Sequence, residues 1–407
     1  MIISGLKKLY QYRGYRLNEV IFSENIVHVN LEFDKRCKDT CPHCGRKGFI
    51  EDVEAREARD MPSGPARLVY IRYPARKFRC NACGTRSWLT PDEIDSKRGV
   101  TKRMMVMASR LMCDMPIKKV AAFINGSETT LRRWDKAVLK EHLGEVCLDN
   151  LSILLVDEKS IGKRHHYITT VLNGETGDLL HCCEGKKKES LKSFFDLLNP
   201  EQKASIQVVC IDRGGAYLEC VKEELPLADI AFDKYHLVSN LNDVIDDLRR
   251  EEWNRLCDAG DEQGKALLKG QRYNLLRREE KNTGWQQRRL DELLAMNQTL
   301  STAYVLTEDF RDALSQNYIC HAKRALEIWV ETAVNSGIGK IVAFARKMEK
   351  ASEGIINAIR YKVSNGMLEG FNNLISRIIH RGNGYKDMDY LKLKLRQASL
   401  PECFKVP

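Results

Sequence analysis

The sequence contains no long uninterrupted run of apolar residues. None approaches the roughly 18 residues that a membrane-spanning helix requires, and the N-terminal stretch MIISGLKKLYQYRGY has no apolar core of the signal-peptide kind. Internal repeats and low-complexity tracts are also absent, which excludes a repeat architecture and a disordered polar chain. These absences predict a globular protein that stays in the cytoplasm and has no membrane partner.

Composition sets broad limits on size and partners. At 407 residues the chain is too long for one ordinary core, so we expect about two to four domains. Apolar residues make up 43% and charged residues 30%, as in soluble globular proteins. Lysine and arginine outnumber aspartate and glutamate, 66 to 56, which suits a polyanionic partner without proving one.

The 14 cysteines include two CxxC motifs, which in a cytosolic protein indicate a metal site rather than disulfides. CPHC at 41–44 and CNAC at 80–83 are each followed by a glycine, which lets the turn fold back. Four thiolates in this pairing close a tetrahedral site, so we expect structural Zn²⁺ on Cys41, Cys44, Cys80 and Cys83. Buried free thiols are the alternative interpretation, and Cys37 and His43 are alternative ligands.

Short alternating runs in the first hundred residues predict strands. Alternate residues from Val27 to Phe33 fall on one strand face, and LVYIRY at 68–73 is a second strand candidate. With the two cysteine motifs on either side of this second strand, residues 1–98 are predicted to form a zinc-ribbon domain.

Residues 115–139 predict two helices joined by a sharp turn. Ser127, after the turn at Asn125 and Gly126, is a good N-cap for the second helix. Four apolar side chains can form a shared core: Val120, Phe123, Leu131 and Trp134. An ordinary helical hairpin fits this pattern equally well.

The neighbouring features favour DNA binding. Beside a zinc ribbon and the basic link at 97–103, we interpret residues 99–148 as a helix-turn-helix domain. The second helix would present its outward side chains to a major groove. We expect DNA contacts from Lys97, Arg98, Lys102, Arg103, Thr129, Thr130, Arg132 and Arg133.

The rest of the chain alternates strands and helices and then becomes helical. The pattern predicts helices at 189–198 and 215–224 and strands at 151–157, 166–173, 178–183, 206–211 and 228–232. From about 237 to 362 the sequence is helical and highly charged, and a last strong helix begins near 364. This order indicates an α/β core that is interrupted by a helical insertion before its final helix.

Two predicted strands end in carboxylates, and the last helix carries another. The apolar run ending at Val156 delivers Asp157 and Glu158, and the next delivers Asp212. On the last helix Glu369 shares a polar face with short amides, although an isolated glutamate there is most often simply solvated. Adjacent strand residues point to opposite faces, so only one of Asp157 and Glu158 can join a shared site, and we favour Asp157.

Several of these stretches resemble the ISL3 (ISL-three) family of bacterial insertion-sequence transposases. The similarity lies in VDEKS with HHYITTVLN, in FDKYHLV and in SNGMLEGFNNLISRIIHRGNGYKDMDYLKLKLR. CPHCG and RKFRCNACGTRSW resemble the family's N-terminal zinc-binding domain. The resemblance covers nearly the whole chain. It implies a DDE transposase with a ribonuclease-H-like catalytic fold, Mg²⁺ or Mn²⁺ dependence and the triad Asp157, Asp212 and Glu369.

The same resemblance implies supporting residues. Asp233 and His236 in FDKYH match a family motif, and we expect His236 to act in the active site; a helix N-cap and a partly buried histidine are the alternative. Tyr217 would supply an aromatic residue that often follows the second aspartate.

We therefore predict a multidomain α/β protein, in which a zinc ribbon and a helix-turn-helix precede a split catalytic core. The core would occupy 149–240 and 361–407, with the helical insertion at 241–360. The predicted function is a DDE transposase that binds terminal inverted repeats and target DNA as a homodimer or higher oligomer, in a bacterial, nucleoid-associated setting. The alternatives are a metal-dependent nuclease on the same fold and a domesticated, non-catalytic DNA-binding regulator.

Overall fold

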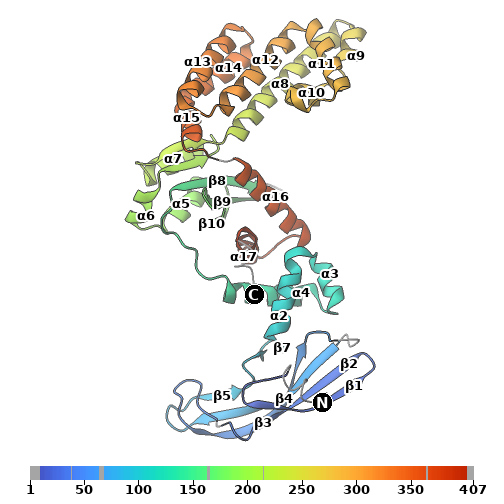
Figure 1. Cartoon of the computed structure of the whole chain (residues 1–407), viewed down its shortest axis with the longest axis vertical. Helices are drawn as coiled ribbons and strands as arrows, with labels where there is room; N and C mark the ends of the chain where they lie inside the picture. The colour runs from blue at the N-terminus through green and yellow to red at the C-terminus, as the bar shows by residue number, and fades with distance from the viewer. Residues whose placement is uncertain are drawn as a thin grey trace. The chain divides into compact units, whose positions relative to one another are not determined.

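The computed structural model describes residues 10–37, 39–63, 68–162, 166–213, 215–363 and 365–400. The chain forms two compact units (Figure 1). The first combines the chain up to Glu145 with the segment from Leu374 onward, and the second spans Val146–Asn373. Among the described residues, every helix is too short or too polar to cross a bilayer.

The first unit begins with a seven-stranded sheet in the order β1-β2-β4-β3-β7-β6, with β5 paired to β4. The strands are β1 Tyr15–Ser23, β2 Ile26–Phe33, β3 Gly48–Asp60, β4 Leu68–Cys80, β5 Arg86–Leu89, β6 Ile94–Asp95 and β7 Val100–Thr101. Along β2, Val27, Val29 and Leu31 are buried and Phe33 is half-buried, so the predicted strand face is confirmed. The observed sheet has seven strands, whereas the sequence predicts only two in this region.

Three helices follow: α2 Lys102–Asp114, α3 Ile117–Phe123 and α4 Glu128–His142. The predicted turn is present, because Asn125 adopts a positive φ of 51° and the Ser127 hydroxyl accepts from the Thr130 amide. The prediction that Phe123 joins the core is wrong, since that side chain is 62% exposed. Phe123 is the last helical residue, and the chain then turns Ile124 into the core instead.

The C-terminal helix α17, Met388–Ser399, packs against α4 in the same unit. Its anchor is Asp135, a fully buried carboxylate of α4. Asp135 accepts hydrogen bonds from Ser109 Oγ and Tyr390 Oη, both at 2.5 Å, and Lys394 Nζ lies 3.1 Å away. This pairing gives a physical reason why the segment after Leu374 belongs to the first unit, although the sequence places it with the catalytic core.

The second unit is built on a five-stranded sheet in the order β10-β9-β8-β11-β12. Its strands are β8 Ile153–Ser160, β9 Tyr167–Asn173, β10 Leu179–Glu184, β11 Val208–Ile211 and β12 Asp229–Phe232. β8, β9 and β10 form an antiparallel meander, whereas β11 runs parallel to both β8 and β12. The accompanying helices are α5 Lys188–Phe195, α6 Pro200–Ser205 and α7 Gly215–Glu224.

A helical insertion follows β12 and gathers into its own layer of the second unit (Figure 1). It comprises α8 Lys234–Asp258, α9 Glu262–Leu268, α10 Arg272–Leu276, the short 3-10 helix Glu279–Lys281, α11 Gly284–Met296, α12 Gln298–Ser315, α13 Ile319–Asn335, α14 Gly339–Lys350 and α15 Ser352–Arg360. The rings of Phe310, Trp329 and Phe344 pack at its centre in tilted and edge-to-face pairs, and Trp329 Nε1 donates to the Leu306 carbonyl at 2.7 Å. This aromatic centre is part of one continuous hydrophobic core that also includes the sheet residues Leu154 and Val209.

The insertion returns the chain to the sheet through α15. Asn357 Nδ2 donates to the Ile230 carbonyl of β12 at 3.0 Å. Gly354 allows this close approach, because a Cβ there would lie 2.4 Å from the Phe232 ring. The chain therefore reaches the sheet edge immediately before α16, Asn365–Arg381, begins.

Candidate active site

Asp157 occupies the centre of the candidate site. It lies on β8 after a run of buried apolar residues and is itself only 3% exposed. Its Oδ2 accepts a hydrogen bond from Asn372 Nδ2 of α16 at 2.6 Å, and its Oδ1 accepts from the Glu158 amide at 2.7 Å. Burial raises the pKa of this carboxyl, while the two hydrogen bonds oppose that rise.

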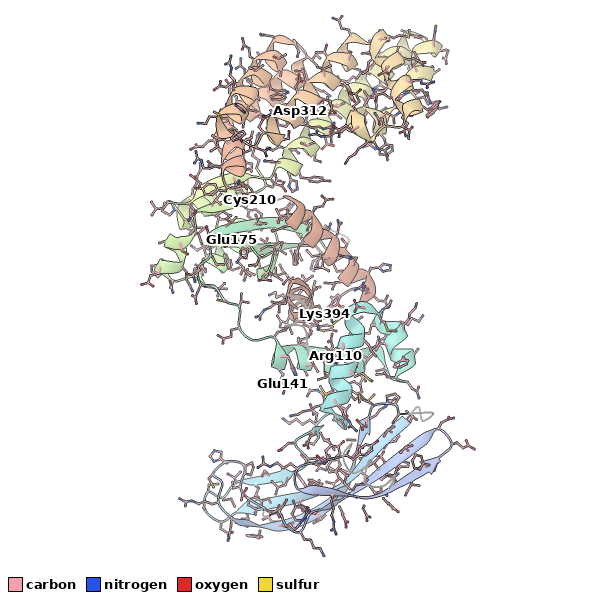
Figure 2. All side chains as sticks on the ribbon, in the orientation of Figure 1. Arg110, Glu141, Glu175, Cys210, Asp312 and Lys394 are labelled. Atoms are coloured by element: carbon pink, nitrogen blue, oxygen red, sulfur yellow. The ribbon has the colours of Figure 1, made fainter. Side chains whose placement is uncertain are left out.

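Asp212 follows β11, the parallel neighbour of β8. The register pairs Val208 with Ile153 and Cys210 with Leu155, so its continuation brings Asp212 level with Asp157 on the same face. Cys210 itself is fully buried inside the sheet (Figure 2). Neighbouring strands are only about 4.8 Å apart, so this register brings Asp212, just past the end of β11, beside Asp157 within β8.

Helix α16 supplies the third predicted carboxylate. Leu368 and Phe371 are buried, whereas Glu369 and Asn373 are exposed, as the helical pattern predicts. The side chain that touches Asp157 is Asn372, one turn beyond Glu369. Among the described residues, Asp157, Asp212 and Glu369 do not form a cluster with all ligand oxygens within 4.8 Å. The sequence pattern places Asn372 on the polar face but does not reveal this contact.

Asp233 and His236 lie at the start of α8. Asp233 is the N-cap and accepts from the Tyr235 amide at 2.8 Å. His236 Nδ1 donates to Asp233 Oδ2 at 2.9 Å. This hydrogen bond, with further help from the charges of Asp212 and Asp157, raises the pKa of His236 to about 9. The imidazole is therefore cationic at neutral pH, and the charges of Asp157 and Asp212 act on it.

Glu158 has a different environment from Asp157. Its carboxylate lies 3.8 Å from Lys186 Nζ, and that ammonium is 4.2 Å from the centre of the Tyr167 ring. Burial is the main reason that its pKa is raised, with Lys186 opposing the rise. Glu158 thus has a cationic neighbour in Lys186, and the charges of Asp157 and Asp212 also act on it.

The aromatic residue expected after the second aspartate is in place. Tyr217 is buried in α7, and its hydroxyl lies 2.6 Å from Thr169 Oγ1 on β9. Burial is the main cause that raises the pKa of Tyr217, so this hydroxyl stays protonated. Tyr217 therefore joins α7 to β9 of the sheet.

The four predicted zinc ligands form one cluster in the first unit. Their sulfur atoms all lie within 4.8 Å of one another, with 3.6 Å from Cys41 to Cys83 and 3.5 Å from Cys44 to Cys80. A tetrahedral Zn²⁺ with bonds of about 2.3 Å spaces its sulfurs about 3.8 Å apart. The arrangement therefore fits zinc, and the alternative ligands Cys37 and His43 lie outside this cluster.

The two cysteine motifs fold alike. Gly45 donates to the Cys41 carbonyl at 2.9 Å, and Gly84 donates to the Cys80 carbonyl at 3.1 Å. Both glycines have a positive φ, 72° and 71°. Only glycine adopts this conformation without strain, which explains its place after each motif.

The predicted DNA-contacting side chains separate into two groups. Lys97, Lys102, Thr129 and Arg133 are exposed. Arg98 is also exposed but pairs with Asp95, and half-buried Thr130 lies 2.9 Å from the Ser127 hydroxyl. Two arginines instead hold the unit together, since Arg103 binds the buried Asp60 and Arg132 binds the carbonyls of Gly382 and Gly384.

Comparison with known proteins places these features in a family. Residues 154–395 match the ISL3-type DDE transposase family, described simply as "Transposase". The transposase of insertion sequence element IS1001 from Bordetella parapertussis is 31% identical over 360 residues, which is 88% of either chain. The transposase of insertion sequence element IS1557 from Mycobacterium tuberculosis is 28% identical over 256 residues, 58% of this chain and 57% of the relative.

Proposed function

Because this chain belongs to the ISL3 family of insertion-sequence transposases, we propose that it cuts and rejoins DNA at the ends of its element. The observation that carries this proposal is the contact of the buried Asp157 with Asn372, one helical turn from Glu369. This contact anchors α16, which carries Glu369, beside β8. Asp212 follows the neighbouring strand β11 on the same side. The order and direction of the five strands support a ribonuclease-H-like core.

The side chains at this edge suit hard divalent cations. Asp157, Asp212 and Glu369 offer only oxygen ligands, which Mg²⁺ and Mn²⁺ prefer. Desolvation disfavours the negative charge of the buried Asp157, and a nearby cation would compensate for it. When bound, two such ions activate the attacking hydroxyl and stabilise the leaving oxygen in phosphodiester exchange.

The surrounding residues orient these carboxylates. The amide of Asn372 fixes one oxygen of Asp157, and the Glu158 amide fixes the other. Asp233 holds the imidazole of His236, whose positive charge lies close enough to influence Asp157. In our proposal His236 balances part of the carboxylate charge and attracts the DNA phosphate.

The first unit would recognise the DNA ends. In our proposal α3 and α4 form a helix-turn-helix whose exposed Thr129 and Arg133 reach base edges or phosphates. Lys97 and Lys102 would add phosphate contacts. The cysteine cluster would hold a structural Zn²⁺ that stabilises the adjoining strands. Both ends of the element must be brought together before they are joined, so we expect a homodimer or higher oligomer on DNA.

The test is strand cleavage and strand joining by purified full-length protein on DNA that carries the element's own ends. Asp157→Asn, Asp212→Asn and Glu369→Gln each remove one ligand charge and should lower both activities by at least ~10²-fold. Glu158→Gln is the matched control and should keep most of the activity. DNA binding should survive in all four variants.

The same assay separates the alternatives. Cleavage without joining would indicate a nuclease on this fold. End binding without either activity would indicate a domesticated regulator. Full activity in all three triad variants would refute the proposed mechanism, and a dead Glu158→Gln with an active Asp157→Asn would reassign the first ligand.

A further inference from the structure

A pocket of about 560 Å³ lies within the first unit, apart from the carboxylate site. Helices α2 and α4 line it together with the C-terminal part of α16 and with α17. The volume is in the range of about 300–1,000 Å³ that small-molecule sites occupy. The pocket is therefore large enough for an organic ligand rather than a single ion.

Basic side chains outnumber carboxylates in the lining. It contains five basic side chains, Arg110, Arg132, Arg377, Arg381 and Lys394. The single carboxylate that lines it, Asp114, is 89% exposed and lies 3.9 Å from Arg381 Nη1. Such a lining favours a ligand with negative charge.

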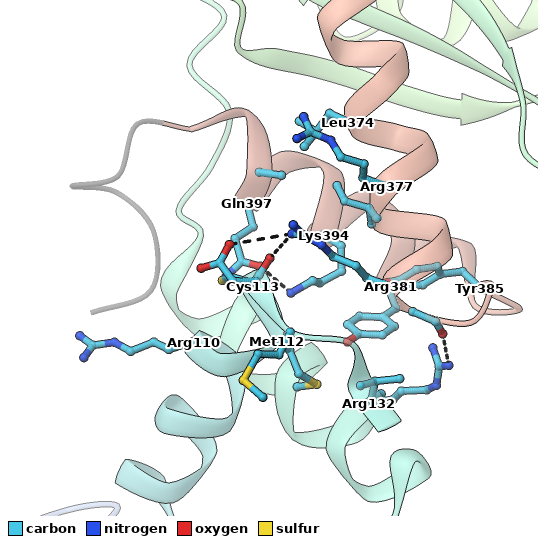
Figure 3. A pocket seen from close by; sticks show the side chains of 17 residues that line it. Arg110, Met112, Cys113, Arg132, Leu374, Arg377, Arg381, Tyr385, Lys394 and Gln397 are labelled. Atoms are coloured by element: carbon cyan, nitrogen blue, oxygen red, sulfur yellow. Dashed lines mark hydrogen bonds and ion pairs between the residues drawn. The ribbon is translucent and has the colours of Figure 1, made fainter. Parts of the chain in front are cut away.

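Two of these arginines are placed to meet an anion. Arg377 is exposed, and within the described part of the chain it has neither a hydrogen-bond nor an ion-pair partner. Arg381, one turn later on α16, donates to the Cys113 carbonyl at 2.7 Å and lies 3.9 Å from the exposed Asp114, yet its side chain stays 37% exposed. Figure 3 shows them in succession along α16, beside Lys394 and Met112. Unused guanidinium donors bind phosphate strongly.

The remaining wall is apolar and aromatic. Met112, Leu374 and the ring of Tyr385 all line the pocket. The ring of Tyr385 lies 5.3 Å from that of Tyr390, whose hydroxyl is fixed on Asp135. This buried hydrogen bond fixes Tyr390, the ring against which Tyr385 packs.

We propose that this pocket binds one nucleotide of the DNA after it has left the base stack. Its phosphate would lie on Arg377 and Arg381, and its base would pack on Tyr385 and Met112. Free inorganic phosphate would use the basic side chains but would leave the aromatic wall and most of the 560 Å³ unoccupied. Any of the four bases stacks favourably on an aromatic side chain. Enzymes that act on DNA bases take a base out of the stack into such a pocket, at a cost in stacking energy. The inference rests on the proposed action on DNA.

The experiment uses full-length protein and end DNA that carries 2-aminopurine at one position at a time. Fluorescence anisotropy establishes saturation, and the base reports unstacking by a rise in its own fluorescence. We expect a several-fold rise at one or two positions. Arg377→Gln and Tyr385→Leu should each abolish it at saturating protein. Arg133→Gln is the control, because this exposed arginine of α4 lies outside the pocket: affinity should fall while the rise at saturation remains.

The outcomes are distinct. The inference is overturned if 2-aminopurine fluorescence does not rise at saturation with the unmodified protein. It is also overturned if Arg377→Gln and Tyr385→Leu both retain the rise. If anisotropy shows no DNA binding at all, the proposed function fails separately. Saturation-transfer NMR with deoxyadenosine monophosphate then judges the pocket: transfer to the base protons that Arg377→Gln removes supports a nucleotide site, and none refutes it. A mononucleotide that binds as tightly as end DNA would overturn the assignment to DNA.

Discussion

Asn372 makes the direct contact between α16 and the buried Asp157, so its removal is the sharpest test of the site. In Asn372→Ala, one oxygen of a carboxylate that is 3% exposed loses its donor. Hydrogen bonds to charged groups contribute about 1.5–3 kcal/mol, and each 1.4 kcal/mol corresponds to about tenfold in rate. We therefore expect strand cleavage to slow by about 10- to 100-fold.

The assay is single-turnover cleavage of end DNA, titrated with Mg²⁺. A misplaced Asp157 should bind the ions less well, so the Mg²⁺ concentration for half-maximal rate should rise, which a general loss of stability would not cause. Asn373→Ala is the matched control, because this neighbouring asparagine is exposed. It should retain nearly full activity. Equal rates and equal Mg²⁺ dependence in the two variants would refute the positioning role.

Three further predictions concern zinc, DNA and pH. Cys41→Ser with Cys44→Ser should remove about one zinc per chain and destabilise the first unit, as elemental analysis and thermal melting would show; unchanged zinc would contradict this. Arg133→Ala should weaken end binding and reduce its salt slope by about one, whereas Arg132→Ala should mainly lower thermal stability, and the reverse pattern would refute our placement. His236 has a raised pKa of about 9, so its charge interaction with Asp233 stabilises fully below about pH 6.5 and is lost as the pH rises through about 9. The unmodified protein should have a higher free energy of unfolding than His236→Gln, and this difference should shrink between about pH 6.5 and 9. A difference that stays constant over this range would contradict the prediction.

Much of the second unit follows from sequence periodicity. The predicted strand at 151–157 matches β8 but ends too early, because β8 continues to Ser160. The charged residues after Val156 suggest an end, yet cross-strand pairing with β9 carries the strand onward. Apolar runs show that a strand is buried, whereas its length depends on a partner that the local pattern does not contain.

The first unit shows the opposite balance. Local signals gave correct caps, such as Ser127 on α4, since capping depends on neighbouring residues alone. Long-range contacts escaped prediction. The helical pattern predicts Arg132 as an outward recognition residue. Its guanidinium instead binds the carbonyls of Gly382 and Gly384, about 250 positions away in the sequence. A helical pattern identifies the exposed face of α4 only until another helix covers part of it.

The burial of Asp135 has a consequence for incomplete copies of such a gene. Its partners Tyr390 and Lys394 lie more than 250 positions later in the chain. Removing the partners of a buried charge costs about 3–5 kcal/mol, enough to unfold a marginal domain. A copy that stops before Tyr390 should therefore yield no stable end-binding fragment, as limited proteolysis of such a product would reveal. Decayed copies would then be unable to compete with the intact protein for the ends of its element.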